Sequence, residues 1–166
     1  MKIVIMSDTH SDRDIIGKVT SYYPEADYYI HCGDSELAAN DVALQNVHKV
    51  GGNCDHDAAY EDDVLLAVGE KNLYITHGHL YNVKSSLMTL AYRAEEVGAD
   101  IVCFGHSHVL GVEKLNSTLF INPGSLKLPR GRKEKTFVVL EMIGETYVVK
   151  CLDENNNLMD EFHYSI

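Results

Sequence analysis

Long apolar runs are absent from this chain of 166 residues. A membrane-spanning helix needs about 20 consecutive apolar residues, and no stretch approaches that length. The first residues turn acidic at Asp8, which is too early for a signal peptide. We therefore expect a cytoplasmic protein without a membrane anchor. Hydrophobic residues make up 45% of the chain, enough for the core of one domain spanning residues 1–166.

Cysteine is scarce and follows no metal-binding pattern. The four cysteines are Cys32, Cys54, Cys103 and Cys151. They form no CxxC pair, so a structural zinc site of the four-cysteine kind is excluded. Three of them lie in or beside apolar runs, where buried free thiols of a reducing compartment are expected. Cys54 is the exception, because it lies inside a polar cluster.

Basic residues are also few. The chain has 14 Lys and Arg against 25 Asp and Glu, a net charge of −11. A general nucleic-acid-binding protein needs a basic face, so no stable nucleic-acid binding is expected. One segment differs, because five basic residues fall close together: Lys127, Arg130, Arg132, Lys133 and Lys135. The simpler interpretation is a solvated loop, and the alternative is an attractor for an anionic substrate.

Short β-branched runs bounded by Gly, Asp or Asn are frequent, and they predict strands. The expected strands are residues 3–6, 28–31, 47–50, 64–68, 73–76, 101–104, 119–121, 137–142 and 147–152. Helical patterns predict helices over about 12–22, 36–45 and 83–97, with Ser11 or Asp12 as a cap of the first and Gly98 ending the last.

The order of these elements indicates the fold class. The first half alternates strand and helix, which implies parallel strands with helical crossovers. The second half has consecutive strands, and the short links 69–72 and 143–146 are typical of hairpins. Two mixed β-sheets packed face to face, with helices outside, satisfy both halves of this α/β chain.

Polar clusters follow five of the expected strands, at residues 7–10, 32–34, 52–55, 76–79 and 105–108. They contain seven metal-friendly side chains: Asp8, His10, Asp34, Asn53, His77, His106 and His108. Ligands bind beyond the carboxyl ends of parallel strands, so these side chains are expected to converge. In the D-x-H and H-x-H spacings, alternate residues of an extended segment would face one site. The neighbouring glycines, at 33, 52, 78 and 105, would let the backbone turn after each strand.

Imidazole mixed with carboxylate and amide oxygen suits Mn, Fe, Ni, Zn or Co. Seven ligands are too many for one tetrahedral ion, and they match two ions that share a carboxylate, about 3.5–4 Å apart. Three further histidines, His48, His56 and His163, lie outside the clusters and are expected to be ordinary surface or structural residues.

The clusters resemble the motifs of the calcineurin-like metallophosphoesterase superfamily, which run D-x-H, G-D, G-N-H-[DE], a histidine motif and G-H-x-H. Residues 122–125, Asn-Pro-Gly-Ser, also look like a segment of its small bacterial and archaeal phosphodiesterase branch. The resemblance implies a four-layer αββα sandwich with a dinuclear centre. One ion would take Asp8, His10, Asp34 and His108, and the other Asp34, Asn53, His77 and His106, with Asp34 bridging.

The resemblance also implies a reaction, the hydrolysis of small phosphoesters, and above all phosphodiesters, by metal-bound hydroxide. Manganese is the expected metal. Asn53 and His79 are expected beside the phosphate, with Arg130 adding positive charge. One position departs from the family, because Cys54 stands where most members have a histidine that is thought to protonate the leaving group. A general acid contributes roughly 10²–10⁴-fold, so this chain should prefer esters with good leaving groups.

The alternative function is a non-catalytic scaffold, since the same fold is reused in retromer-type complexes. Such relatives would be expected to lose ligands, whereas this chain keeps all seven. An enzyme is therefore the preferred interpretation, and a homo-oligomer is compatible with the sequence.

Overall fold

The computed structural model describes residues 1–165. In chain order the strands, α-helices and short 3-10 helices (η) are β1 (Lys2–Met6), α1 (Arg13–Ser21), β2 (Tyr28–His31), η1 (Val42–Leu44), β3 (Val47–Lys49), β4 (Asp63–Val68), β5 (Lys71–Thr76), η2 (His79–Tyr81), α2 (Met88–Val97), β6 (Ile101–Cys103), β7 (Leu110–Leu115), β8 (Thr118–Pro123), β9 (Thr136–Ile143), β10 (Thr146–Asp153) and β11 (Leu158–Ser165).

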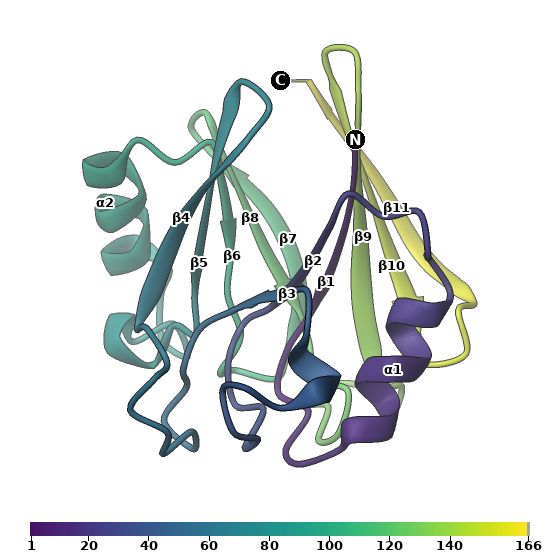
Figure 1. Ribbon diagram of the computed structural model, residues 1–166. Coiled ribbons are helices and arrows are strands. Elements are labelled where there is room, and N and C mark those ends of the chain that lie inside the picture. Colours follow the sequence, from purple (N-terminus) through teal and green to yellow (C-terminus); the bar gives the residue numbers. More distant parts are fainter. Residues whose placement is uncertain (166) are drawn as a thin grey trace.

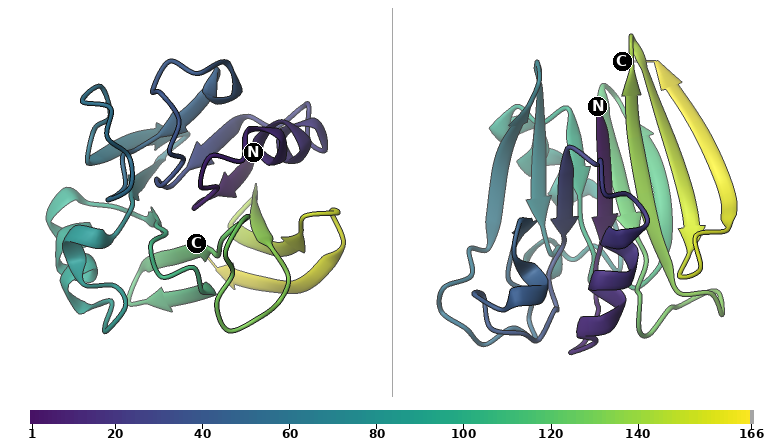
Figure 2. Two further views of the ribbon diagram at one scale, coloured as in Figure 1. Left: turned by 90° about the horizontal axis from the view of Figure 1, so that it is seen from below. Right: turned by 45° about the vertical axis from the view of Figure 1, so that its right-hand side comes forward.

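Two mixed sheets pack face to face in the middle of the molecule (Figure 1). One has six strands in the order β11-β10-β9-β1-β2-β3, and the other has five in the order β4-β5-β6-β8-β7. Helices α1 and α2 lie on opposite outer sides (Figures 1 and 2). The predicted α/β sandwich with helices outside is confirmed.

Three apolar clusters fill the spaces between these layers. The cluster between the sheets includes Ile5, Ile75 and Ile121, all fully buried. A second joins α1 to the six-stranded sheet, and a third packs α2 against the five-stranded sheet through Leu90 and Phe120. Burial of apolar surface on both faces of each sheet therefore fixes the order of the four layers.

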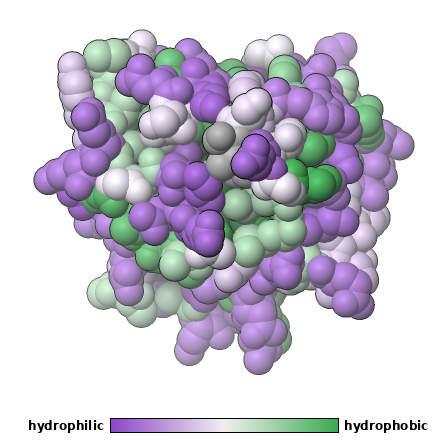
Figure 3. All heavy atoms as spheres, turned by 90° about the horizontal axis from the view of Figure 1, so that it is seen from above, coloured by the Kyte–Doolittle hydropathy of each residue, from purple (hydrophilic) through white to green (hydrophobic). Residues whose placement is uncertain are grey.

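Parallel pairing brings the carboxyl ends of several strands to one end of the sandwich. Strands β1, β2 and β3 are parallel neighbours in one sheet, and β5, β6 and β8 in the other. Their ends lie at the bottom of Figure 1. The opposite end carries the hairpin turns after β4 and β9, as predicted, and hydrophilic and hydrophobic residues are interspersed there (Figure 3). The polar clusters therefore lie at the bottom end of the sandwich.

Two of the three predicted helices are present. Helix α1 begins after Asp12, whose carboxylate accepts a hydrogen bond from the Ile15 amide at 3.2 Å. Helix α2 ends at Gly98, with φ of 67°, as predicted. It starts five residues later than expected, because Gly78 and Asn82 adopt left-handed φ angles of 96° and 53°. Over residues 1–165, no helix has the length and apolar character to cross a membrane.

The helix predicted over 36–45 is wrong, since only the three-residue 3-10 helix η1 forms there. Glu36 has a left-handed φ of 55°. The amides of Glu36 and Ala39 bond to the carboxylates of Asp55 and Asp57, at 2.7 and 2.8 Å. The left-handed φ of Glu36 and these contacts with a distant loop therefore hold the start of the segment outside helical geometry.

All nine predicted strands are present, and two further strands, β7 and β11, were not predicted. Both are edge strands. The β7 sequence, LGVEKL, interrupts its apolar alternation with glycine and two charges, and β11, LMDEFHYS, is mostly exposed. Edge strands bury little apolar surface, so their sequences carry a weak pattern.

Candidate metal centre

The loops after β1, β2, β5 and β6 meet at the lower end of the sandwich. The Asp8 amide donates to the Gly33 carbonyl and the Gly105 amide to the His77 carbonyl, each at 3.0 Å. These backbone contacts join loops of the same sheet. The His77 ring then crosses to the other sheet, because its Nδ1 donates to the Cys32 carbonyl at 2.7 Å. The strand-end clusters therefore converge, as their positions predicted.

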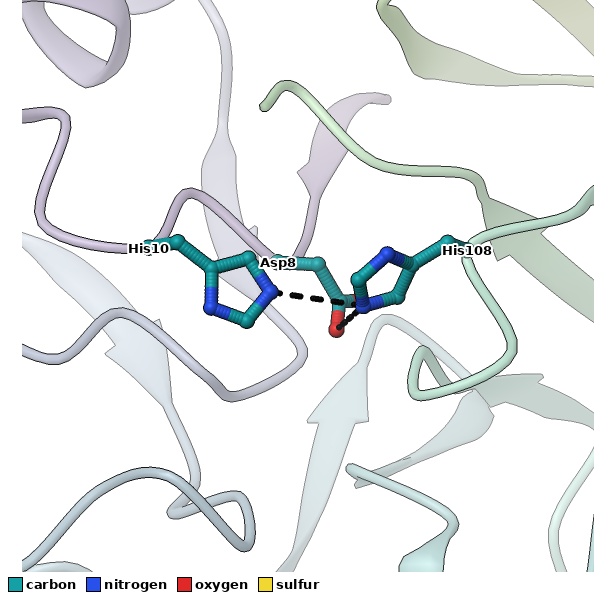
Figure 4. Close-up of side chains that lie close together, drawn as sticks. All are labelled: Asp8, His10 and His108. Carbon is teal, nitrogen blue, oxygen red and sulfur yellow. Dashed lines mark hydrogen bonds and ion pairs between the residues drawn. The ribbon is translucent and has the colours of Figure 1, made fainter. Parts of the chain in front are cut away.

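One group of ligand atoms consists of Asp8, His10 and His108 (Figure 4). His108 Nε2 lies 3.0 Å from Asp8 Oδ1 and 3.3 Å from His10 Nε2. His108 Nδ1 donates to the Leu128 carbonyl at 2.7 Å, and His10 Nδ1 donates to Glu36 Oε1 at 2.6 Å. When both rings are neutral, each turns a lone pair on Nε2 toward the other. Facing lone pairs repel unless a cation lies between them.

A second group consists of Asp8, Asp34 and His77, all buried. His77 Nε2 lies 3.3 Å from Asp34 Oδ2 and 4.0 Å from Asp8 Oδ1. Among the described residues, His77 Nε2 and Asp8 Oδ1 are buried atoms without a hydrogen-bond partner. The short distance from Asp8 Oδ1 to His108 does not supply one, because the His108 proton is on Nδ1. Buried unpaired polar atoms are costly, and a divalent cation would satisfy both.

The two groups share Asp8 in this structure, whereas the resemblance assigns the bridging role to Asp34. The donor set, imidazole nitrogens with carboxylate oxygens around a buried point, fits divalent transition metals. The residues present therefore fit the expected metals.

The remaining predicted residues lie around these groups. The His106 ring centroid is 5.1 Å from that of His77, and the His79 centroid is 5.4 Å away. Asn53 is exposed, and its amide donates to the Cys54 thiol at 3.3 Å. Within residues 1–165, no side-chain hydrogen bond joins Asn53 to the other six predicted ligands. Arg130 is close, because its amide donates to the His108 carbonyl at 3.0 Å.

The backbone of the ligand loops differs from the prediction. Left-handed φ angles of 41–66° occur at five predicted ligands: Asp8, His10, Asp34, His106 and His108. The D-x-H and H-x-H segments are therefore not extended, and strand alternation does not explain how their side chains face one site. Non-glycine residues in this region cost of order 1–3 kcal/mol each, and such strain clusters at functional sites.

At two of the four glycines beside the ligands, glycine is needed because another side chain lies very close, and not because the backbone turns there as predicted. Neither Gly52 nor Gly105 has a positive φ. A Cβ at Gly52 would overlap the Asp34 carboxylate, and one at Gly105 would overlap the Ser7 hydroxyl. Gly33 and Gly78, with φ of 95° and 96°, do turn the chain as predicted.

Asp55 organises the loops, although the sequence assigned it no role. Its carboxylate accepts hydrogen bonds from the amides of Asp34, Gly52 and Glu36 at 2.7–2.8 Å, and from the Ser35 hydroxyl at 3.2 Å. In the sequence, the indication of such a role was the position of Asp55 in the 52–55 cluster. Glu36, which holds His10 Nδ1, lies two residues after Asp34 and carried no signal of its own.

Electrostatics keep the carboxylates ionised. Burial raises the pKa of Asp8, but the Ser7 hydroxyl and, in their protonated forms, the His108 and His77 rings outweigh it and lower the pKa below its usual value. Burial also opposes ionisation of Asp34, and the Cys54 amide and, in its protonated form, the His77 ring overcome it, so this pKa is lowered too. Conversely, burial and the Asp34 carboxylate raise the pKa of the Cys54 thiol to about 11. Two carboxylates and a protonated thiol therefore border the site.

Known proteins resemble this chain over almost its whole length. The model of the calcineurin-like phosphoesterase superfamily domain matches residues 1–145. The probable metallophosphoesterase YsnB of Bacillus subtilis is 40% identical over 162 residues, which cover 97% of this chain and 96% of that protein. Phosphodiesterase MJ0936 of Methanocaldococcus jannaschii is 28% identical over 145 residues, covering 75% and 83%.

Solved structures agree with these sequence relatives. The crystal structure of a Streptococcus pneumoniae protein, described as a predicted phosphoesterase, superimposes with a TM-score of 0.95, 31% identity and coverage of 99% and 97%. Vps29 of Chaetomium thermophilum shares the fold, with a TM-score of 0.79, 18% identity and coverage of 99% and 98%. Together with the converging Asp and His side chains, these similarities show that the chain belongs to the calcineurin-like phosphoesterase superfamily.

Proposed function

We propose that this protein is a metal-dependent phosphodiesterase that hydrolyses small phosphoesters at a dinuclear centre. One observation carries the proposal: Asp8 Oδ1 and His77 Nε2 are buried ligand atoms without partners, beside the facing Nε2 atoms of His10 and His108. The name of the phosphodiesterase relative, MJ0936, supports diesters as the substrate class.

The proposed ligand sets follow the family motifs. One ion takes Asp8, His10, Asp34 and His108, and the other takes Asp34, Asn53, His77 and His106. When bound, two divalent ions, which we propose to be manganese, would polarise the phosphoryl group and supply the attacking nucleophile.

The protein's own part in this proposal is to aim the ligands. The carbonyls of Cys32 and Leu128 accept from Nδ1 of His77 and His108, so each Nε2 faces the centre. The Glu36 carboxylate does the same for His10. Ring tautomers fixed in this way favour metal binding and raise ligand basicity.

Substrate contacts are proposed for three residues. Asn53 and His79 would neighbour the phosphate, and Arg130 would add positive charge. His79 Nδ1 is buried without a hydrogen-bond partner among the described residues, which supports a polar contact there.

Cys54 is a poor general acid in this proposal. Its thiol stays protonated at neutral pH, because its pKa is raised to about 11, but so weak an acid assists a departing alkoxide little. We therefore propose that aryl diesters, whose leaving groups need no proton, are turned over faster than alkyl diesters.

We further propose that residues 1–166 act as one domain in the cytoplasm. All four cysteines are free, and three are buried, which suits a reducing compartment.

The test is turnover of bis(p-nitrophenyl) phosphate by the manganese-loaded protein. Activity should appear with Mn²⁺, disappear with a chelator, and be abolished by His108→Ala. The control variant His163→Ala alters an exposed histidine whose ring contacts Glu161, and it should keep full activity. Metal binding without turnover of any diester would favour the scaffold alternative instead.

A further inference from the structure

A cavity of about 500 Å³ opens beside the metal centre, on the outer face of the five-stranded sheet. Its apolar wall includes Phe104 and Phe120, with Val83 and Leu87 from the segment that leads into α2. Its polar edge includes Ser107 and Asn122. Ligand pockets typically measure 300–1,000 Å³ and combine a mostly apolar lining with a few polar groups. This cavity has both properties.

One loop separates the cavity from the ligand atoms. Ser107 lines the cavity and lies between His106 and His108 in the sequence. The Asn122 amide holds the loop, because it donates to the Gly105 carbonyl and to the Ser107 hydroxyl, each at 3.0 Å. A compound bound at the metal centre could therefore extend past this loop into the cavity.

Charged side chains stand where the cavity meets the centre. Lys84 and Arg130 both line the cavity and are exposed. The Arg130 amide donates to the His108 carbonyl at 3.0 Å, which places Arg130 beside the ligand loop. Glu113 lines the cavity as well. The charged side chains that line the cavity, two cations and one anion, therefore have a net charge of +1. Two cations near the ligand loop suit a phosphate at this border.

We propose that this cavity holds a planar aromatic ring of the substrate, while the phosphate to which the ring is attached lies at the metal centre. The inference rests on the proposed function. The mostly apolar wall would bury more apolar surface of a ring than of a short alkyl group. Because this preference would come from binding, it is separate from the leaving-group effect expected at Cys54.

Gly111 of β7 offers a way to fill the cavity. It lines the cavity, it is exposed, and a Cβ there meets no atom within 4 Å. Gly111→Leu should therefore occupy the space without straining the strand. Gly17→Leu is the matched control, because Gly17 lies on the exposed face of α1 and also has no atom within 4 Å of an added Cβ.

The experiment measures binding of phenylphosphonate and methylphosphonate to the manganese-loaded protein by titration calorimetry. We expect phenylphosphonate to bind about tenfold more tightly to the wild type and to Gly17→Leu, from partial burial of the ring. In Gly111→Leu the ratio should fall to about one, with methylphosphonate affinity unchanged. Adenosine 5′-monophosphate against ribose 5-phosphate repeats the comparison with a nucleobase and shows which kind of ring is preferred.

Three results would overturn the proposal: equal affinities within both pairs for the wild type, a preference that persists in Gly111→Leu, or failure of all four compounds to bind. If Gly111→Leu does not fold, the wild-type ratios alone decide. Turnover of bis(p-nitrophenyl) phosphate tests the proposed function separately, so the cavity can fail while the phosphodiesterase stands.

Discussion

The loops of the metal centre depend on Asp55, and its removal gives the most quantitative prediction. In Asp55→Ala, three backbone amides and the Ser35 hydroxyl lose their shared acceptor. Two of these amides, of Asp34 and Gly52, hold the loops that carry predicted ligands. We expect the variant to fold, to be clearly less stable, and to bind metal weakly.

The magnitude follows from the number of bonds. A hydrogen bond to a charged group contributes about 1.5–3 kcal/mol. Asp55 is half-buried, so water replaces part of each lost bond, and we take about 1 kcal/mol for each of the three amides. The expected loss is about 3 kcal/mol in the free energy of unfolding. For a chain of this size, that lowers Tm by about 6–12 °C.

Chemical denaturation of the metal-free protein measures this loss, and Asp57→Ala is the matched control. Asp57 also accepts from two backbone amides, of Ala39 and Ala59 at 2.8 and 3.0 Å, but it is exposed. Water can replace its bonds, so Asp57→Ala should lose clearly less stability than Asp55→Ala. Equal losses in the two variants would refute the claim that Asp55 organises the site.

Three further predictions concern single side chains. Glu36→Gln should weaken metal binding about 10–100-fold, because the Glu36 carboxylate orients the His10 ring, and should not lower stability by more than about 1 kcal/mol. Unchanged affinity in a Mn²⁺ titration would contradict this. Cys54→His should raise turnover of alkyl diesters by up to about 10²–10⁴-fold and should raise turnover of nitrophenyl diesters little. An equal rise for both would contradict the claim that the wild type lacks a proton donor for the leaving group. Burial lowers the pKa of His31 from 6.5 to about 4. Between these two pH values the unfolded chain therefore binds more protons than the folded chain. Roughly 3 kcal/mol of stability should be lost as the pH falls from 6.5 toward 4. Denaturation at pH 7.5 and 4.5 should show a smaller loss for His31→Gln, and an equal loss would contradict that assignment.

The sequence predicted the parts of the fold that depend on local pattern. The nine predicted strands carry β-branched runs, and the capping residues Asp12 and Gly98 act where the chain predicted them. Within each sheet, the convergence of the ligand clusters followed from parallel strands, because their carboxyl ends share one edge.

What the sequence missed depends on contacts between distant segments. Residues 36–45 carry a helical pattern, but Glu36 has a left-handed φ, and Asp55 and Asp57 hold the Glu36 and Ala39 amides in a non-helical loop. The left-handed backbone of His106 and His108 has no signature in G-H-S-H, since it is imposed by the packed loop. The cavity likewise combines Phe104 and Phe120 with Lys84, which come together only in the folded chain.

The number of metal ions bound per chain, measured by elemental analysis after equilibrium dialysis against Mn²⁺, tests the central claim most directly. We predict two ions in the wild type and a clear reduction in Asp34→Asn, because both sites depend on that carboxylate. One ion in the wild type, or an unchanged count in Asp34→Asn, would contradict a dinuclear centre bridged by Asp34.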